Sequence, residues 1–244
     1  MNQLPFFGQS YHTMTSPYFF EETLPDLPEF VLSEETSRHI IQVLRMEEEE
    51  EIIITNGKGY RIFARIQVAD KKKTKVRLVR KELAERPAPK TAIAISLVRN
   101  NNRFEWFAEK ATEIGISAIL PMICRHTEKT HFKMERTRSI LISAMLQSQQ
   151  SWLPELSEPV KISEIIKNEN YEQKFIAHCA DGEKKELAGI VSGTASKIIL
   201  IGPEGDFSQE EIQTALQQHY LPVSLGNTRL RTETAGIAAA VLIK

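Results

Sequence analysis

The spacing of hydrophobic positions changes near residue 85, and the change divides the chain into two regions. In the first region, the β-branched and aromatic runs Glu51–Thr55 and Tyr60–Ile66 flank an Asn56-Gly57 turn. Such a pair between two apolar runs is typical of a β-hairpin, since both residues accept positive φ at low cost. Lys75–Val79 alternates basic and apolar residues, as a half-buried strand does. This region is therefore predicted to be a small β-rich domain, a barrel or a sandwich.

One helix is expected in the first region, over Ser33–Leu44. Ser33 can accept a hydrogen bond from a free N–H of the first turn, and Glu34 and Glu35 place negative charge at the positive end of the helix. The first region is thus β-rich with a single helix.

The segment Glu85–Lys90 is interpreted as a linker. It contains two closely spaced prolines, which continue neither a helix nor a central strand. We expect one domain over residues 1–85 and a second over residues 86–244. Residues 1–13 fit no element and are expected to be flexible, and Met14 could be the natural start.

After the linker, apolar strands alternate with helical segments. Strands are predicted at Ala92–Val98, Ala118–Ile123, Lys174–Ala180, Lys197–Gly202 and Pro222–Gly226. Helices are predicted at Phe104–Ile114, Glu135–Gln149, Ser163–Lys167, Ser208–Tyr220 and from Thr232 onward. This alternation favours a parallel sheet covered on both faces, whose ligands bind beyond the carboxyl ends of the strands. The loops in question follow Val98, Ala180, Ile201 and Leu225.

Composition narrows the class of protein. The 244 residues include 41% hydrophobic and 26% charged residues, as in an ordinary globular protein. No apolar run approaches the roughly 20 residues of a membrane helix, and no secretory signal is recognisable, so we expect a cytoplasmic protein. Cys124 and Cys179 form no CxxC pair and the histidines lack metal-ligand spacing, so no metal is expected.

Charge distribution is more informative than the net charge of −1, which does not suit a general nucleic-acid coat. Lys71–Lys81 holds basic residues and no acid, whereas Glu47–Glu51 is entirely acidic. We interpret the basic segment as an RNA contact, with a solvated strand edge as the alternative, and the acidic run as solvated.

Familiar catalytic signatures are missing. The first strand of the second region is not followed by Gly-x-Gly-x-x-Gly, and the chain contains neither a Walker A motif nor Gly-x-Ser-x-Gly. These absences weigh against dinucleotide dehydrogenases, P-loop nucleotide hydrolases and serine hydrolases.

The loop after Ile199–Ile201 is the first candidate for ligand binding. It reads Gly-Pro-Glu-Gly from Gly202 to Gly205, and a capping box of Ser208 and Glu211 starts the next helix. Its glycines allow backbone amides to approach a ligand without an intervening Cβ. The alternative is a tight strand-to-helix turn without further function.

The loop after Leu225 is the second candidate. It carries Arg229 and Arg231 and leads into a helix beginning at Thr232. The start of a helix offers free amides and a positive dipole end. A capped surface helix with a salt bridge would show the same pattern, but two arginines beside a strand-end loop favour a function.

Together these loops resemble the RsmE family of SPOUT-class bacterial methyltransferases, which act on uridine N3 of 16S ribosomal RNA. The resemblance extends from about Pro17 to Lys244 and rests on four segments: Gly202–Ser208, Leu225–Ala235, Phe104–Gly115 and Arg38–Met46.

The resemblance implies an α/β fold in two parts. These are a small N-terminal PUA-like β-barrel that helps to bind RNA, and a C-terminal SPOUT domain with a mostly parallel sheet and a trefoil knot. It further implies S-adenosylmethionine held in the knot, a homodimer, and 16S ribosomal RNA of the small subunit as the substrate. Knots are nearly absent from folds, so the periodicity alone could not predict one.

The resemblance and the loops together select the candidate site residues. The cofactor-binding candidates are Ile201, Gly202, Pro203, Glu204, Gly205, Leu225, Gly226, Leu230, Arg231, Thr232, Thr234 and Ala235. The RNA-binding candidates are Arg38, Arg45, Lys73, Lys75, Arg103, Lys110 and Arg229, where a structural ion pair is the alternative for Arg103 and Lys110.

The catalytic candidates are Arg231, Glu233 and Glu113. Arg231 could stabilise negative charge on the uracil carbonyl oxygens. Uridine N3 carries a proton at neutral pH, which Glu233 or Glu113 could accept. The interpretation we favour is that the carboxylate orients Arg231.

This chain departs from the family pattern at several places. Asp206 stands where the family has a second glycine, and Thr228 replaces an arginine, so that Arg229 falls one position later. Met145–Gln150 lacks the acid, glycine and arginine of the family's Glu-Gln-Ser-Gly-Arg, and Glu47–Glu51 replaces a Gly-Asp turn. These departures leave open a non-catalytic RNA-binding or ribosome-assembly protein, and a related methyltransferase of transfer RNA is a further alternative.

Overall fold

The computed structural model describes residues 16–167 and 170–244. The chain divides into two compact units, one formed by the chain up to Thr55 with Arg61–Glu82, the other by Asn56–Tyr60 with Leu83–Lys244. The flexible segment expected at residues 1–13, and Met14, lie outside the described residues.

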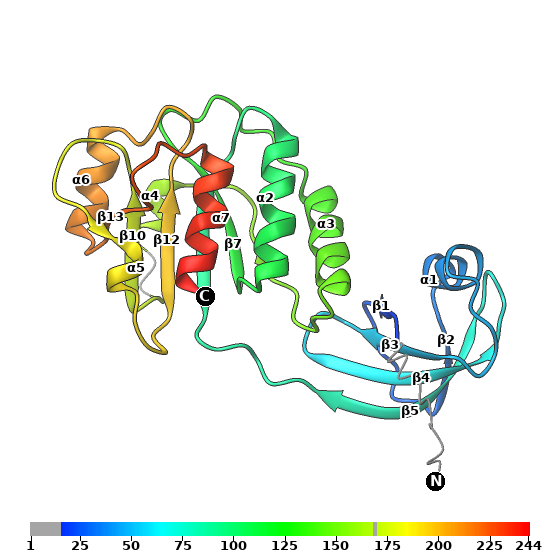
Figure 1. The fold of residues 1–244 in the computed structure, drawn as a ribbon. Coiled ribbons are helices and arrows are strands. Elements are labelled where there is room, and N and C mark those ends of the chain that lie inside the picture. Colours follow the sequence, from blue (N-terminus) through cyan, green and yellow to red (C-terminus); the bar gives the residue numbers. More distant parts are fainter. Residues whose placement is uncertain (1–15, 168–169) are drawn as a thin grey trace, which may run out of the picture. The chain divides into compact units, whose positions relative to one another are not determined.

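The first unit is built on a five-stranded sheet (Figure 1). In spatial order its strands are β1 (Tyr18–Phe20), β3 (Glu51–Thr55), β4 (Tyr60–Val68), β5 (Lys75–Leu83) and β2 (Glu29–Val31). β3 and β4 pair antiparallel, which confirms the hairpin, and β1 runs parallel to β3. Alternate residues of β4 are buried with Ile52 and Ile54 of β3. One apolar face therefore forms the core of this unit.

The helical segment of the first unit differs from the prediction of one α-helix. It consists of α1 (Glu34–Arg38) and a π-helical turn, η1 (His39–Val43). Ser33 caps α1 as expected, its Oγ accepting from the N–H of Thr36 at 3.2 Å. The widened turn coincides with a β-branched stretch, which packs poorly in an α-helix, and it buries Ile40 completely.

The second unit is an α/β fold around an eight-stranded sheet whose pairings are all parallel, as predicted. Its strands in spatial order are β11 (Lys185–Glu186), β13 (Leu221–Ser224), β10 (Gln173–Ala177), β12 (Lys197–Ile201), β6 (Thr91–Ser96), β7 (Ala118–Ile123) and β8 (Glu155–Leu156), and β9 (Val160–Lys161) also pairs with β7. The two-residue strands β8, β9 and β11 were not predicted, because so short a pairing leaves no periodic signal.

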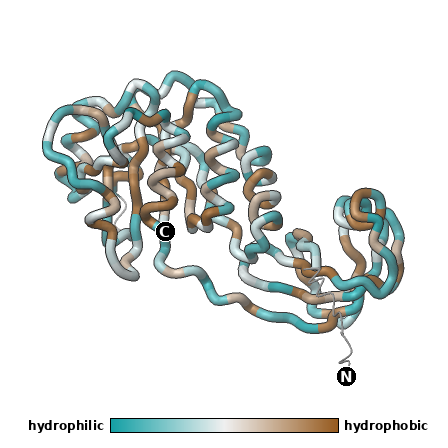
Figure 2. The backbone as a smooth tube through the Cα atoms, in the orientation of Figure 1, coloured by the Kyte–Doolittle hydropathy of each residue, from teal (hydrophilic) through white to brown (hydrophobic). Residues whose placement is uncertain are grey.

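Helices cover both faces of this sheet (Figure 1). They are α2 (Asn101–Ile114), α3 (Met134–Gln147), α4 (Ile162–Ile165), α5 (Leu187–Ile190), α6 (Gln209–Gln217) and α7 (Thr232–Ile243). Ile93 and Ile95 of β6 face the core under α2 and α7, while Ala92 and Ala94 face the core under α4 and α6. Figure 2 shows the central strands as hydrophobic and the connecting loops as mostly hydrophilic.

Helix α7 packs unusually close to α2. A Cβ on Gly236 would lie 2.7 Å from ring carbons of Phe107 and 2.9 Å from Ile95 Cδ1. Only glycine permits this approach, which brings the first turns of the two helices together. In residues 16–167 and 170–244, no helix combines the length and apolar character needed to span a bilayer.

Candidate functional site

The carboxyl ends of the central strands meet at one edge of the second unit's sheet. Ala177 at the end of β10 pairs with Ile201 of β12 on one side and with Val223 of β13 on the other. The helix after β12, α6, packs on one face of the sheet, whereas α7, after β13, packs on the opposite face. A crevice opens where the connections after β12 and β13, which flank β10, leave toward opposite faces, and this is where such sheets bind ligands.

A cavity of about 280 Å³ occupies this crevice. Its lining is Ala177, Cys179, Ile201, Gly202, Pro203, Glu204, Asp206, Arg229, Leu230, Arg231, Thr232 and Ala235. The hydroxyl of Thr232 donates to the carbonyl oxygen of Gly202 at 3.0 Å, which ties the two loops together across the crevice. The structure thus brings both loops singled out in the sequence to one cavity.

Several cofactor candidates lie outside this lining. Leu225 packs against the apolar core, and Gly226 has a φ of 119°. Gly205 lies against His126, and Thr234 lines a neighbouring hollow. Sequence reasoning missed Ala177 and Cys179, although the end of this strand was among the expected ligand loops.

Asp206 takes the place of the family's second glycine, and the structure gives a physical reason. Its φ of 63° lies in the left-handed region, which glycine favours and aspartate tolerates better than most residues. Its carboxylate accepts hydrogen bonds from the backbone N–H groups of Cys179 and Phe207, both at 2.8 Å. The negative charge therefore fixes the loop after β12 to the loop after β10.

A second hollow, of about 630 Å³, adjoins the cavity. It is lined by Asn102, Arg103, Trp106, Arg229, Leu230, Arg231, Glu233 and Thr234. The residues shared with the cavity are Arg229, Leu230 and Arg231, so this short segment forms a common wall.

Glu233 is the acidic residue of this hollow. Its side chain is only 8% exposed, and its Oε1 lies 3.6 Å from Nε of Arg103. Oε2 is buried and has no hydrogen-bond partner among the described residues. Burying half a carboxylate without a partner is costly, so a ligand that reached this oxygen would be stabilised by it. The ion pair is with Arg103 and not with Arg231, because α7 approaches α2 so closely.

Both parts of the chain are similar to domains of known proteins. Residues 84–244 match the profile of an RNA methyltransferase domain, and residues 32–79 match that of an RNA methyltransferase PUA domain. The chain belongs to this RNA methyltransferase family. The PUA-like first unit, the mostly parallel sheet and the enzyme class expected from the sequence are thereby confirmed.

Three relatives illustrate the similarity. The ribosomal RNA small subunit methyltransferase E of Buchnera aphidicola subsp. Acyrthosiphon pisum is 29% identical, over 93% of this chain and 92% of its own. A solved structure from Porphyromonas gingivalis is 33% identical, with a TM-score of 0.86 over 92% of this chain and 95% of its own. The corresponding enzyme of Neisseria gonorrhoeae, bound to S-adenosyl methionine, is 26% identical, with a TM-score of 0.82 over 92% of this chain and 95% of its own.

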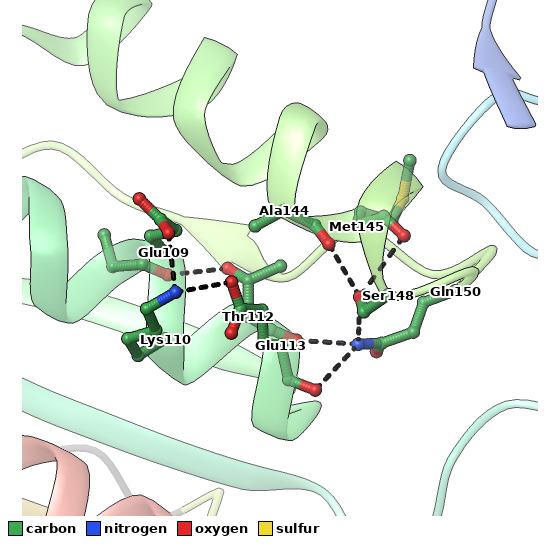
Figure 3. Close-up of polar contacts among 9 residues, drawn as sticks. Glu109, Lys110, Thr112, Glu113, Ala144, Met145, Ser148 and Gln150 are labelled. Carbon is green, nitrogen blue, oxygen red and sulfur yellow. Dashed lines mark hydrogen bonds and ion pairs between the residues drawn. The ribbon is translucent and has the colours of Figure 1, made fainter.

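The RNA-binding candidate Lys110 and the catalytic candidate Glu113 lie away from the hollow, on the last turns of α2 (Figure 3). Lys110 Nζ donates to Glu109 at 2.7 Å and to Glu113 at 2.8 Å, and these bonds raise the pKa of Lys110. Glu113 is ten positions beyond Arg103 on the same helix, or about 15 Å along its axis. The structure therefore does not bring Glu113 together with Arg231 and Glu233.

The Met145–Gln150 segment, which departs from the family pattern, packs against the same end of α2 (Figure 3). The side-chain amide of Gln150 donates to the backbone oxygens of Thr112 and Glu113, at 2.8 and 3.2 Å, and to Ser148 Oγ at 2.8 Å. In this methyltransferase the segment closes the end of a helix.

The remaining RNA candidates differ in how they are paired. Arg38 and Lys75 form ion pairs with Glu34 and Glu29, at 2.8 and 2.6 Å. The exposed side chains of Arg45, Lys73 and Arg229 form no ion pair with described residues. A cation without an ion partner can neutralise a phosphate without first breaking a contact.

Proposed function

We propose that this protein transfers a methyl group from S-adenosylmethionine to N3 of a uridine in 16S ribosomal RNA of the small subunit, as a cytoplasmic homodimer. The observation that carries the proposal is the wall shared by the crevice and the hollow that contains the half-satisfied Glu233. The family membership and the ribosomal RNA named for the relatives support the same reaction.

The residues of the crevice fit the cofactor. Small and apolar side chains such as Ala177, Ile201 and Ala235 suit a purine ring, while the first turn of α7 offers backbone amides to polar groups. Glu204 and Asp206 add negative charge to the lining, which suits a sulfonium cation. We propose that the twelve cofactor candidates hold S-adenosylmethionine through these two loops, eight of them in the cavity lining and four beside it. We further propose that the loops are tied in the trefoil knot that the family resemblance implies.

The hollow suits the uridine, and its residues divide the chemistry. S-adenosylmethionine supplies an electrophilic methyl group when bound. Uridine N3 must lose its proton for attack, and the acid that lines the hollow is Glu233, whose Oε2 has no partner among the described residues. Arg231 lines both the cavity and the hollow, and it can stabilise negative charge on a uracil carbonyl oxygen next to N3. Arg103 holds the other oxygen of Glu233. We therefore assign Glu233 as the base and not as a group that orients Arg231.

We further propose that residues 1–85 form an RNA-binding domain and residues 86–244 the methyltransferase domain. Exposed, unpaired cations of the first domain, Arg45 and Lys73, support phosphate binding there. Arg229, on the shared wall, would contact the RNA near the reacting base.

The test is calorimetric titration with S-adenosylmethionine, followed by transfer of labelled methyl groups to small-subunit RNA and mass spectrometry of the nucleosides. We expect saturable binding and N3-methyluridine from the wild type, and loss of transfer in Arg231→Ala. Lys110→Ala is the matched control, because it removes a cation far from the crevice. Gly202→Val is less suitable, since its side chain would press on the Phe207 ring, 3.0 Å from the added Cβ.

Two other results would each reject a part of this proposal. A folded protein that binds no cofactor at millimolar concentration would favour a non-catalytic RNA-binding protein. Methylation of transfer RNA in place of small-subunit RNA would retain the enzyme class but reject the substrate.

A further inference from the structure

We propose that Trp106 is the platform on which the target uracil stacks, and that the hollow beside it selects uracil over cytosine. This inference rests on the proposed function and specifies how the substrate is held there.

Trp106 is exposed where a large aromatic side chain would ordinarily be buried. It is 47% exposed and lies three positions after Arg103 on α2, so both side chains project from the same face of the helix. Both line the hollow with Arg229, Arg231 and Glu233. An aromatic ring is thus placed beside the groups proposed to act on the base.

The chain's other tryptophan has a different environment. Trp152 Nε1 donates to the backbone oxygens of Ala84 and Glu85, at 3.2 and 3.1 Å, and its ring lies where a Cβ on Gly59 would have to be. Packing therefore accounts for Trp152. In contrast, no hydrogen bond or ring contact within the described residues accounts for the exposed ring of Trp106.

The surroundings of Trp106 favour a nucleotide as the occupant. An aromatic ring among arginines is the combination that binds single-stranded nucleic acid, because the ring stacks on a base while the cations neutralise phosphates. Arg103, Arg229 and Arg231 supply these cations. One stack of this kind contributes about 1–3 kcal/mol, or about 5- to 150-fold in affinity.

Glu233 adds selectivity among pyrimidines. Its buried Oε2 can only accept a hydrogen bond while the carboxylate is ionised. Uracil presents N3–H, which is a donor. Cytosine N3 is an acceptor, so its lone pair would face a lone pair of the carboxylate oxygen and no hydrogen bond could form. A buried mismatch of this kind is a strong basis for rejection.

The experiment compares wild type, Trp106→Phe and Trp106→Ala in steady-state transfer to in-vitro-transcribed 16S ribosomal RNA. We expect Trp106→Ala to raise KM for RNA at least about fivefold, with Trp106→Phe close to wild type, because phenylalanine retains a stacking face. Cofactor affinity should stay unchanged in both, since Trp106 does not line the cavity.

A binding measurement keeps the inference separate from the reaction. Titration with hexauridylate, excited at 295 nm, should quench a component of the fluorescence that is absent in Trp106→Phe, and hexacytidylate should quench it less. Because this readout needs no catalysis, it stands even if methyl transfer fails.

Two results would overturn the inference. One is an active wild type whose KM and quenching are the same in Trp106→Ala. The other is a change from dimer to monomer in light scattering of Trp106→Ala, which would assign the exposed ring to contact between copies of the chain.

Discussion

Helix α2 carries two clusters of charge, and they differ in what their partners leave unsatisfied. In its first turns, Arg103 meets the buried Glu233 at 3.6 Å, and one carboxylate oxygen has no partner among the described residues. In its last turns, Lys110 lies between Glu109 and Glu113 at 2.7 and 2.8 Å, with side chains that remain partly exposed. Both clusters contain residues that the sequence marked as candidates for function.

The comparison separates a structural cluster from one suited to chemistry. In the Lys110 cluster each carboxylate already shares one oxygen with the ammonium group and remains partly exposed to water. The Arg103 cluster keeps a buried oxygen unpaired, which costs stability unless a ligand uses it. On one helix, unsatisfied burial therefore distinguishes the end proposed for chemistry better than the mere presence of charge does.

Neutralising one acid in each cluster should separate the two clusters most clearly. Glu233→Gln removes the proposed base and should lower kcat about 10²- to 10⁴-fold, the usual contribution of such a group. Glu113→Gln should leave kcat unchanged. Cofactor binding measured by calorimetry should survive in both, because neither acid lines the cavity. Equal losses in the two variants would show that the clusters are not functionally distinct.

Close helix packing is the second target, because it holds the Arg103 cluster together. Gly236→Ala would place a Cβ 2.7 Å from the Phe107 ring, and overpacking of this kind should destabilise the fold by about 1–3 kcal/mol in urea denaturation. Gly189→Ala is the matched control: this helical glycine has no atom within 4 Å of an added Cβ. It should be neutral or slightly stabilising. A Gly236→Ala variant as stable as wild type would mean that α7 can move away from α2 at little cost.

A third prediction concerns Glu105, which joins the first half of α2 to α3. Its two oxygens accept from Arg136 at 2.6 and 2.8 Å, and these hydrogen bonds lower the pKa of Glu105 below its ordinary 4.5. Glu105→Gln should cost about 1 kcal/mol at neutral pH, less than a fully buried charged pair, because Arg136 is largely exposed.

The sign of the pH effect follows from this lowered pKa. The ion pair contributes its full stability above pH 4.5, and the contribution is lost as pH falls through the pKa of the folded protein. Urea denaturation of wild type and Glu105→Gln should therefore converge on acidification. A constant difference down to low pH would show that the carboxylate charge does not stabilise this contact.

The sequence predicted the crevice but not what surrounds Glu233. Continuous apolar strands imply a parallel sheet, and its geometry alone brings the loops after Ile201 and Leu225 to one edge. The partner of Glu233 depends on the distance between α2 and α7, which Gly236 and Phe107 set through space. The sequence predicts only that Trp106 lies in a helix, because the exposure of one ring depends on tertiary packing that periodicity does not report.

The mildest variant removes the cation of the Lys110 cluster. Lys110→Gln breaks two exposed ion pairs and should change the free energy of unfolding less than Glu105→Gln does, because water screens exposed pairs. If the Lys110 cluster is structural, the variant should bind 16S ribosomal RNA with an unchanged salt dependence. Lys73→Gln is the positive control, because its exposed ammonium has no ion partner among the described residues and should reduce the slope of log affinity against log salt by about one. A comparable reduction in Lys110→Gln would mean that RNA opens these ion pairs, and that full pairing in the free protein does not exclude a functional role.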